Sequence, residues 1–391
     1  MKILFLQHGF GYGGATKSLQ VMQKGLFEKV EIHTITKKNK RLNKILQKEF
    51  IHSNGIIEID IDGVYSYSED ISSEADFEKA KRYNPETIIN YINKHNVDIL
   101  HINSSVFSNI LKAIKEKTNC KIVVHFREVL KHQGNHPIDK FIIEQTKLYA
   151  DTIIGISNNE VSCFNSLEKI HILPNPHDFS ETDQYINQSA IKTNEIKIGM
   201  CANFNPIKGH LVFLEAIQLI NDYNKKHNLN ISFKIIGYPI YKNRLLKFLK
   251  SVIGNRYLKS FETKLHQLQI KNLTLVPFTL DVYSVLSDID IYVRPDLSGN
   301  PWGRDIIEAM AMQIPIVATG TSEVYIINGK TGYLVEASNP LKLAKKTIEL
   351  LENVSLRNTL KKQAYVHVKQ LCDLNAFSNN LLSIYNKLVS I

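Results

Sequence analysis

The sequence predicts an α/β protein made of two doubly wound domains that face each other across a cleft. Short apolar runs alternate with helical patterns along the chain, as they do in parallel sheets with crossover helices. The 391 residues exceed what one ordinary core accommodates, so about two domains are expected. An apolar content of 43% with 22% charged residues indicates a globular chain rather than a disordered one.

Thirteen short apolar runs are the predicted strands. In the first half of the chain they occupy residues 3–6, 30–35, 57–61, 99–102, 121–125, 152–156 and 170–173. In the second half they occupy residues 196–201, 231–236, 273–276, 289–293, 314–318 and 333–335. Ligands of parallel sheets bind beyond the carboxyl ends of the strands. The residues that follow each run are therefore the candidate site residues.

The polar stretch 181–195 shows little periodicity and is predicted to be a linker. We therefore expect an N-terminal domain over residues 1–180 and a C-terminal domain over residues 196–375. The last helix, in residues 376–391, follows the helices of the second domain and could cross back to pack on the first.

The formal charge of +10 favours anionic partners such as nucleic acid, anionic lipid or phosphorylated metabolites. Basic residues are not interleaved with aromatic ones, which argues against nucleic acid. The stretch 242–250 is basic and amphipathic at helical spacing. It predicts a solvated helix face or, alternatively, a patch that docks on a membrane surface.

Several features favour the cytoplasm, with peripheral contact at the inner face of the membrane as a further option. No run approaches the roughly 18 apolar residues that cross a bilayer, and the N-terminus resembles a first strand more than a signal peptide. The four cysteines have no CxxC spacing, so neither disulfides nor a zinc site is expected.

The first predicted strand leads into Gly9-Phe10-Gly11-Tyr12-Gly13-Gly14, which satisfies the spacing GxGxxG. A dinucleotide site also needs an acidic residue at the end of the second strand, where this chain has Thr36-Lys37-Lys38. A nicotinamide cofactor is therefore disfavoured. We interpret Gly13 and Gly14 as a turn that lets a substrate approach the backbone and that opens a helix from Thr16.

Two basic side chains follow strands. His125 ends the strand at 121–125, so its ring is expected to face the cleft and donate to a hydroxyl; a structural His bonded to backbone is the alternative. Lys208 follows Asn205-Pro206, a plausible N-cap and first helical residue. A Lys at a helix start adds its charge to the helix dipole and predicts a diphosphate site. A plain surface Lys is the alternative.

Glu308 is the only acid in the otherwise apolar run 306–312. A carboxylate in such a place is costly unless it has partners. Sugar hydroxyls are suitable partners, and an exposed acid is the alternative. The helix that carries Glu308 could be capped by Asn300-Pro301 or could begin near Gly303, and it should end before Pro315.

A further strand-to-helix turn is predicted at 319–324, after the strand at 314–318. Its backbone amides would face the cleft, and Thr321 and Glu323 lie in it.

The order and spacing of these motifs resemble those of the retaining GT-B glycosyltransferases of family 4 over nearly the whole chain. The matching segments are Gly13-Gly14, His125, Leu173-Pro174-Asn175-Pro176, Lys208-Gly209, Glu308-Ala309-Met310-Ala311 and Asn328-Gly329-Lys330-Thr331-Gly332-Tyr333-Leu334-Val335. The resemblance implies two Rossmann-like domains, with the acceptor on the first and the nucleotide sugar on the second. It also implies that neither a metal nor another cofactor is needed.

The resemblance further implies roles for individual residues. Lys208 would bind the donor diphosphate and Glu308 the ribose hydroxyls. His125 would contact the transferred sugar, while Gly13 and Gly14 would let donor phosphate or acceptor approach the first domain.

Two positions depart from the family pattern. Asn300 stands eight positions before Glu308, where the family has the first of two glutamates, and Asn203 stands where an Arg commonly precedes the helix Lys. We hypothesise that Arg304, close to the expected phosphate, supplies the missing cation. Gly303 beside it completes the expected donor-binding set together with Thr321, Glu323, Asn203 and Asn300.

The function that the resemblance implies is retaining transfer of a sugar from a UDP- or GDP-sugar to a glycan or lipid-linked acceptor, in surface polysaccharide synthesis. A nucleotide-sugar epimerase of the same architecture is one alternative. A sugar-binding protein without catalytic activity is another, because both departures fall within the donor site.

Overall fold

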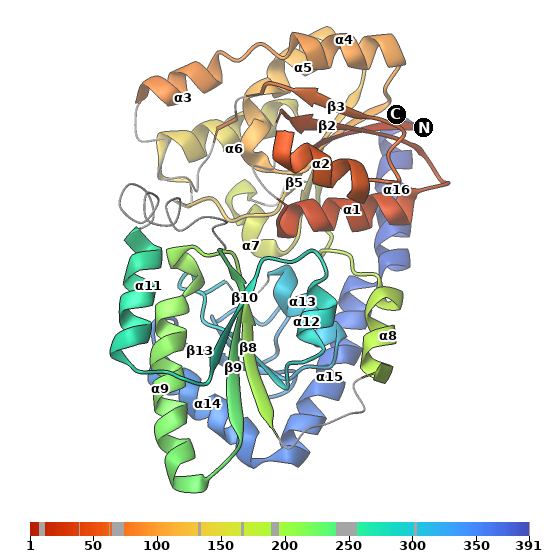
Figure 1. Cartoon of the computed structure of the whole chain (residues 1–391). Helices are drawn as coiled ribbons and strands as arrows, with labels where there is room; N and C mark the ends of the chain where they lie inside the picture. The colour runs from red at the N-terminus through yellow and green to blue at the C-terminus, as the bar shows by residue number, and fades with distance from the viewer. Residues whose placement is uncertain are drawn as a thin grey trace. The chain divides into compact units, whose positions relative to one another are not determined.

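The computed structural model describes residues 1–7, 12–38, 40–61, 63–64, 74–131, 134–165, 168–188, 195–239, 256–300 and 303–390. They form two compact units (Figure 1). The first unit comprises Met1–His177 with Cys372–Ile391, and the second comprises Asp178–Leu371. The basic amphipathic stretch 242–250 lies outside the described residues.

The first unit is built on a seven-stranded parallel sheet in the order β3-β2-β1-β4-β5-β6-β7. Its strands are β1 (Lys2–Gln7), β2 (Glu31–Lys37), β3 (Ile56–Ile59), β4 (Ile99–Ile102), β5 (Lys121–Phe126), β6 (Thr152–Gly155) and β7 (Ile170–Ile172). From β1 the chain first adds strands on one side and then, from β4, on the other. The carboxyl ends of β1 and β4 therefore form a topological switch point.

Helices cover both faces of this sheet. They are α1 (Gly14–Leu26), α2 (Lys40–Glu49), α3 (Glu74–Lys81), α4 (Glu86–His95), η1 (Ser105–Ile110), α5 (Leu111–Lys117), α6 (Pro137–Tyr149), α7 (Asn158–Val161), η2 (Ser162–Phe164) and α16 (Leu374–Val389). Leu4 and Leu6 of β1 belong to one core, whereas Ile3 and Phe5 belong to another. This alternation follows from the two-residue period of a strand.

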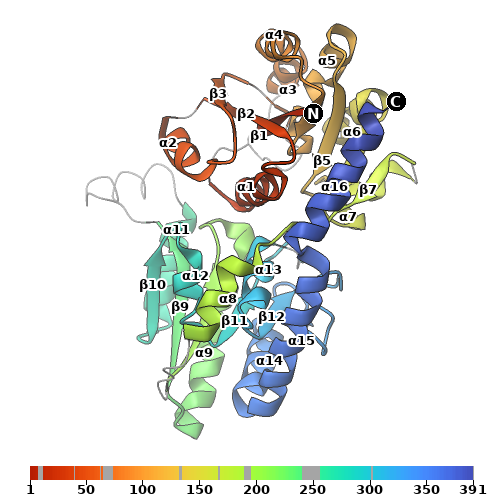
Figure 2. The same cartoon turned by 90° about the vertical axis from the view of Figure 1, so that its right-hand side faces the viewer.

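Helix α16 returns the chain to the first unit, where it lies beside α1 in both views (Figures 1 and 2). Its Phe377, Leu381 and Tyr385 belong to the same core as Ile3 and Phe5 of β1. Just before the helix, the amide of His177 donates to the carbonyl of Cys372 at 2.7 Å. The first unit is thus assembled from two separate stretches of the chain.

The second unit is built on a six-stranded parallel sheet in the order β10-β9-β8-β11-β12-β13. Its strands are β8 (Ile196–Cys201), β9 (Ile231–Tyr238), β10 (Leu273–Pro277), β11 (Ile291–Arg294), β12 (Ile316–Thr319) and β13 (Tyr333–Val335). The strand order reverses between β8 and β11, so the switch point of this sheet lies at their carboxyl ends.

The helices of the second unit are α8 (Phe179–Gln188), η3 (Pro206–Lys208), α9 (His210–His227), α11 (Arg256–Gln267), α12 (Val282–Leu286), α13 (Arg304–Ala311), α14 (Pro340–Glu352) and α15 (Val354–Cys372). Residues 181–188 of the stretch expected to be a linker are therefore helical. Helix α8 packs on α12 and α13.

The prediction of two Rossmann-like domains with parallel sheets is confirmed, and each of the thirteen predicted strands overlaps a strand of the structure. The predicted strand-to-helix turn at 319–324 is wrong. Residues 320–332, all of them described, run through bends and turns to β13. Side chains accept hydrogen bonds from backbone amides there: the Thr331 hydroxyl accepts from the Ile327 amide at 2.8 Å, and Oδ1 of Asn328 accepts from the Leu334 amide at 3.0 Å. Such bonds compete with a helix.

Candidate functional site

Lys208 lies beyond the carboxyl end of β8, next to the switch point of the second sheet. The Asn205 side chain accepts from the Ile207 amide at 3.1 Å and so caps the short helix η3. Gly209 then turns the chain with φ +71°, and α9 begins at His210. The predicted cap is therefore real, but Lys208 ends η3 instead of opening α9. A Cβ at Gly209 would also collide with the carbonyl of Pro295, so this turn requires glycine.

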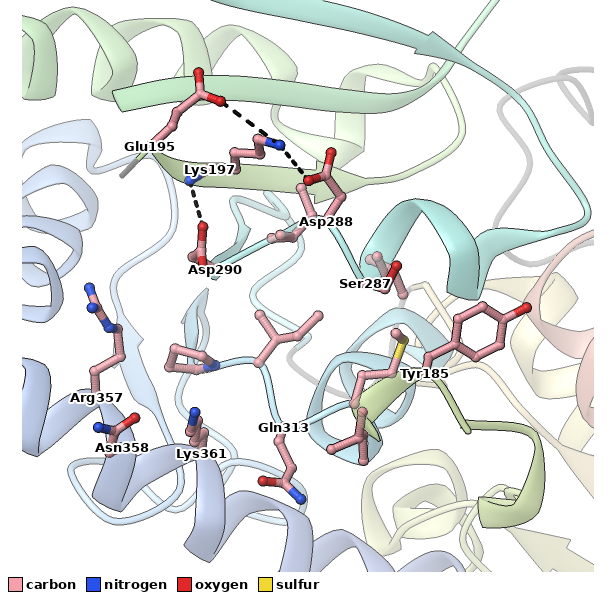
Figure 3. Close-up of a pocket in the computed structure, with 16 residues that line it drawn as sticks. Tyr185, Glu195, Lys197, Ser287, Asp288, Asp290, Gln313, Arg357, Asn358 and Lys361 are labelled. Carbon is pink, nitrogen blue, oxygen red and sulfur yellow. Dashed lines mark hydrogen bonds and ion pairs between the residues drawn. The ribbon is translucent and has the colours of Figure 1, made fainter. Parts of the chain in front are cut away.

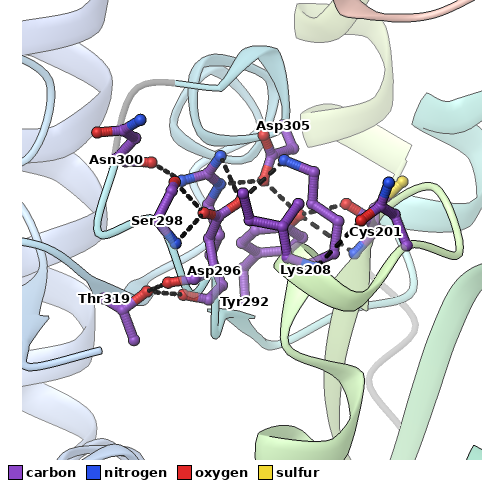
Figure 4. A network of polar contacts seen from close by, with 11 residues as sticks. Cys201, Lys208, Tyr292, Asp296, Ser298, Asn300, Asp305 and Thr319 are labelled. Carbon is purple, nitrogen blue, oxygen red and sulfur yellow. Dashed lines mark hydrogen bonds and ion pairs between the residues drawn. The ribbon is translucent and has the colours of Figure 1, made fainter. Parts of the chain in front are cut away.

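The ammonium of Lys208 is paired with a buried carboxylate (Figure 4). Its Nζ lies 2.8 Å from Oδ2 of Asp296, and the side chains of Lys208 and Asp296 are 35% and 2% exposed, respectively. The same carboxylate lies 3.4 Å from Nη2 of Arg294, the last residue of β11. The Ser298 amide donates to its other oxygen at 3.0 Å. Two cations from opposite sides of the switch point thus converge on one carboxylate.

A second carboxylate completes this network. Oδ2 of Asp305, in the first turn of α13, accepts from Nε of Arg294 at 2.9 Å and from the Tyr292 hydroxyl at 3.0 Å. That hydroxyl also lies 3.1 Å from both the amide and the carbonyl of Cys201, at the end of β8. The switch point therefore carries two cations and two carboxylates, and the strands, η3 and α13 hold them in place.

Electrostatics at the network keep Asp296 ionised. Burial raises the pKa of the Asp296 carboxyl, but Arg294 and Lys208 outweigh burial, so its pKa lies below the usual value. Burial also raises the pKa of the Tyr292 phenol well above its ordinary value. At neutral pH Tyr292 thus keeps its hydroxyl proton, which can be donated to Asp305 or to the Cys201 carbonyl.

Gly303 is the N-cap of α13, which settles where this helix begins. A Cβ at Gly303 would lie 2.9 Å from Nη2 of Arg294 and would collide with the Asp305 carboxylate. Asn300, the nearby departure from the family pattern, accepts a hydrogen bond from Arg294 through its backbone carbonyl. The structure thus brings Asn300, Gly303 and Lys208 together around Arg294.

Arg304 and Glu308 form a buried pair one helical turn apart in α13. Nε of Arg304 lies 2.9 Å from Oε1 of Glu308, and their side chains are 4% and 9% exposed. Glu308 therefore has a protein partner, which accounts for a carboxylate in an apolar run. Arg304, expected as the second phosphate cation, points at Glu308, whereas Arg294 is the cation that joins the Lys208 network.

The remaining predicted donor residues lie on loops beyond strands of the second sheet. Asn203 is exposed on the loop that follows β8. Thr321 and Glu323 are exposed on the loop that follows β12. All three are at the carboxyl edge, the edge on which the Lys208 network lies, and their roles stay predictions.

In the first unit the predicted residues gather at the other switch point. Gly13 is the N-cap of α1 and Gly14 its first residue, whereas residues 8–11 of the glycine-rich stretch lie outside the described residues. Asn103, just beyond β4, donates to the carbonyl of Ala15 at 3.2 Å and so ties the two sides of the switch point together.

His125 lies near the carboxyl end of β5 and is fully buried. Its Nδ1 is 3.4 Å from Nη2 of Arg127, whose Nε donates to Asn103 at 2.6 Å and whose Nη1 donates to Asn175 at 2.5 Å. Burial and the nearby Arg127 hold the pKa of the His125 imidazole well below its ordinary value. His125 is therefore neutral at physiological pH.

A cavity of about 300 Å³ lies at the opposite edge of the second sheet (Figure 3). It is bounded by Lys197 at the start of β8, by Asp288 and Asp290 before β11, and by Gln313 before β12. Lys197 is already paired there with Asp288 at 2.5 Å. The cavity thus faces the amino ends of the strands, away from the edge where doubly wound sheets bind their ligands.

Over the described ranges no group of three or more His, Cys, Asp or Glu side chains is arranged to hold a metal ion. Over the same ranges, no helix has both the length and the apolar character of a membrane span.

Doubly wound α/β sheets bind their ligands at switch points such as this one. Residues 181–367 match the family model described as glycosyl transferases group 1. That part of the chain is a domain of this family, which confirms the resemblance for the second unit.

Curated relatives agree with this assignment. CapM of Staphylococcus aureus, a capsular polysaccharide biosynthesis glycosyltransferase, is 25% identical over 223 residues, which are 51% of this chain and 58% of CapM. MJ1178 of Methanocaldococcus jannaschii, an uncharacterized glycosyltransferase, is 29% identical over 165 residues, 40% of this chain and 41% of that protein. The similarity thus spans about half the length of these relatives.

Solved structures share the fold over the whole chain. HepE of Anabaena, in complex with UDP and glucose, superposes with a TM-score of 0.77 at 16% identity, covering 99% of this chain and 100% of HepE. TarM of S. aureus, a mutant solved with fondaparinux, α-GlcNAc-glycerol and UDP, superposes with a TM-score of 0.71 at 16% identity over 99% and 100% of the two chains. At such identity the likeness concerns the fold alone.

Sequence reasoning missed Arg294, Asp296 and also His101, whose Nε2 lies 3.2 Å from Nδ1 of His125. The first two stand at the carboxyl end of β11 and just beyond it, so the rule that ligands bind at carboxyl ends could have pointed to them. His101 lies inside the apolar run of β4, and no local signal distinguishes it from a core residue.

Proposed function

We propose that the chain is a retaining glycosyltransferase that moves a sugar from a UDP- or GDP-sugar to a glycan or lipid-linked acceptor in surface polysaccharide synthesis. The observation that carries the proposal is the pair of cations, Lys208 and Arg294, at the switch point of the second sheet. They lie within the residues that match the glycosyltransferase family. CapM, a capsular polysaccharide enzyme by name, supports the polysaccharide context.

Lys208 is the cation that can move to a diphosphate. Its side chain is 35% exposed, whereas its partner Asp296 is 2% exposed. An arriving diphosphate would compete with Asp296 for the ammonium, while Arg294 stays anchored by Asp305 at 2.9 Å. The positive charge would then stabilise the departing nucleotide diphosphate as the bond to the sugar breaks. In this scheme side chains take the place of a metal ion, in line with the expected metal independence.

Glu308 is proposed to bind the ribose hydroxyls of the nucleotide. The bond from Arg304 occupies Oε1, and a carboxylate offers acceptor capacity on both oxygens. Arg304 would hold the carboxylate in orientation. In the first unit, His125 would contact the transferred sugar, and Gly13 and Gly14 would allow close approach of phosphate or acceptor.

The direct test is incubation with a panel of UDP- and GDP-sugars and an acceptor, read by released nucleotide, with NMR of the product for anomeric configuration. HepE has been solved with UDP-glucose, so UDP-sugars come first. Lys208→Ala should weaken UDP binding strongly. Lys225→Ala, which changes an exposed Lys of α9 paired with Asp222, is the matched control and should leave binding unchanged.

Three outcomes separate the candidate functions. Release of nucleotide that depends on acceptor supports transfer. Conversion of the nucleotide sugar without acceptor indicates the epimerase. Binding of UDP or GDP without any release indicates a sugar-binding protein, and absence of both binding and turnover refutes the proposal. The expected cytoplasmic site of action and the contact with anionic membrane stay predictions.

A further inference from the structure

A buried chain of three side chains runs behind His125 in the first unit. The hydroxyl of Tyr385, on α16, lies 2.5 Å from Nδ1 of His101 on β4. Nε2 of His101 lies 3.2 Å from Nδ1 of His125 on β5. All three side chains are 0% exposed. The contact between Tyr385 and His101 joins residues 284 positions apart.

Arg127 fixes the direction of the hydrogen bonds in this chain. A guanidinium only donates, so the contact from its Nη2 at 3.4 Å requires a lone pair on Nδ1 of His125. A proton on Nδ1 would also face the positive charge of Arg127. The single proton of a neutral His125 therefore sits on Nε2.

The remaining bonds follow from that choice. His101 must donate its Nε2 proton to Nδ1 of His125, so its own Nδ1 carries the lone pair and accepts from the Tyr385 hydroxyl. Burial lowers the pKa of His101 well below its ordinary value, and burial raises the pKa of the Tyr385 phenol well above its own. Each member is therefore neutral at physiological pH, and every hydrogen bond runs in one direction, from Tyr385 toward His125.

In this arrangement Nε2 of His125 carries a proton that it can donate. Nε2 of His125 is buried and makes no hydrogen bond within the described residues. A buried donor without a partner is costly, and a ligand oxygen would satisfy it.

We propose that Tyr385 and His101 are positioning residues that hold His125 in the Nε2–H form, so that His125 meets its ligand only as a hydrogen-bond donor. The inference rests on the proposed function for the nature of that ligand, a hydroxyl oxygen of the transferred sugar. In this form Nε2 has no lone pair with which to take a proton. His125 therefore orients the sugar and does not act as a general base.

The test uses the full chain labelled with ¹⁵N-histidine and long-range ¹H–¹⁵N correlation spectra at neutral pH, which distinguish the two tautomers of each ring. A His125→Gln variant assigns the signals. The expected result is His125 with its proton on Nε2 and His101 likewise. A wild-type His125 protonated on Nδ1, or on both nitrogens, overturns the proposal. This readout needs no turnover, so it stands even if no sugar is transferred.

Variants then separate positioning from packing. Tyr385→Phe and His101→Leu should shift the His125 signals toward a mixture of tautomers, while His101→Gln, whose amide still donates, should restore the wild-type pattern. In turnover assays Tyr385→Phe should lower kcat about tenfold, the size of one lost hydrogen bond, with UDP affinity unchanged. Ser378→Ala, which removes another buried hydroxyl of α16, is the control and should change neither. Unaltered His125 signals in both Tyr385→Phe and His101→Leu would overturn the role of the chain.

Discussion

Asp296→Asn should lower the stability of the second unit and raise its affinity for UDP at the same time. The substitution keeps the size of the side chain and removes one negative charge from beneath Arg294 and Lys208, which approach it to 3.4 and 2.8 Å. Stability falls because the carboxylate stabilises the two cations in the free protein. UDP affinity rises because the same carboxylate competes with an arriving diphosphate for one of them.

The magnitude can be worked from the contacts. Removing one partner of a buried ion pair costs about 3–5 kcal/mol. Here Arg294 keeps Asp305 at 2.9 Å, and Lys208 is 35% exposed, so water can take over part of its solvation. We therefore expect a loss of about 2–3 kcal/mol. For a unit of this size that lowers Tm by roughly 4–12 °C. One extra positive charge near the diphosphate is worth on the order of 1 kcal/mol in a partly solvated site, or about fivefold in Kd.

Calorimetric melting gives the stability, and titration with UDP gives the affinity. Asp222→Asn removes an exposed carboxylate beside Lys225 and is the matched control, with an expected change within about 0.5 kcal/mol. A Tm shift no larger than that of the control would show that Asp296 is not holding the buried cations. UDP affinity that falls, as expected for Lys208→Ala, would show that Asp296 positions Lys208 for the phosphate instead of competing with it.

Three further predictions concern the stability of the two units. Because the folded pKa of Asp296 is lowered by Arg294 and Lys208, the stability it contributes is present above about pH 4 and is lost as pH falls through the folded value; Asp296→Asn should flatten this acid limb in melts between about pH 2 and 5, and an unchanged slope would count against the pair. Gly209→Ala should destabilise the second unit by more than about 1 kcal/mol, because φ is +71° and the Pro295 carbonyl occupies the space of a Cβ; chemical denaturation measures it, and a neutral result would contradict the turn. Leu381→Ala, at a residue 0% exposed on α16, should cost about 2–5 kcal/mol, whereas Leu341→Ala, at a residue 65% exposed, should stay within about 0.5 kcal/mol; equal Tm values for the two would argue against the packing of α16.

The strands could be predicted because their signal is local. Runs such as Ile99–Ile102 are rich in branched residues and short enough to exclude a helix. The residue that caps a helix could be predicted, but the length of that helix could not. The Asn205 side chain does accept a hydrogen bond from a backbone amide, yet η3 ends at Lys208, just before Gly209. No sequence rule fixes the length of a capped helix.

The networks could not be predicted because the fold, and not a local sequence pattern, decides which side chains meet. Arg294 at the end of β11 meets Asp305 only because the loop and α13 return to the strand end. His101 looked like a core residue of β4, and its partner Tyr385 arrives from the far end of the chain. Arg304 lies close to Asp305 in sequence, but a one-residue step turns it to another face of α13, where it meets Glu308.

The placement of α16 has a consequence for the order in which the protein folds as it is synthesised. Residues 178–371, the whole second unit, leave the ribosome before residues 372–390, which the first unit still lacks. Until then the core around Ile3 and Phe5 lacks the side chains of α16, Phe377, Leu381 and Tyr385 among them. At about 5–20 residues per second this interval lasts on the order of 10–40 seconds. While the second unit is being synthesised, the first unit still lacks α16 and exposes apolar side chains that chaperones can bind.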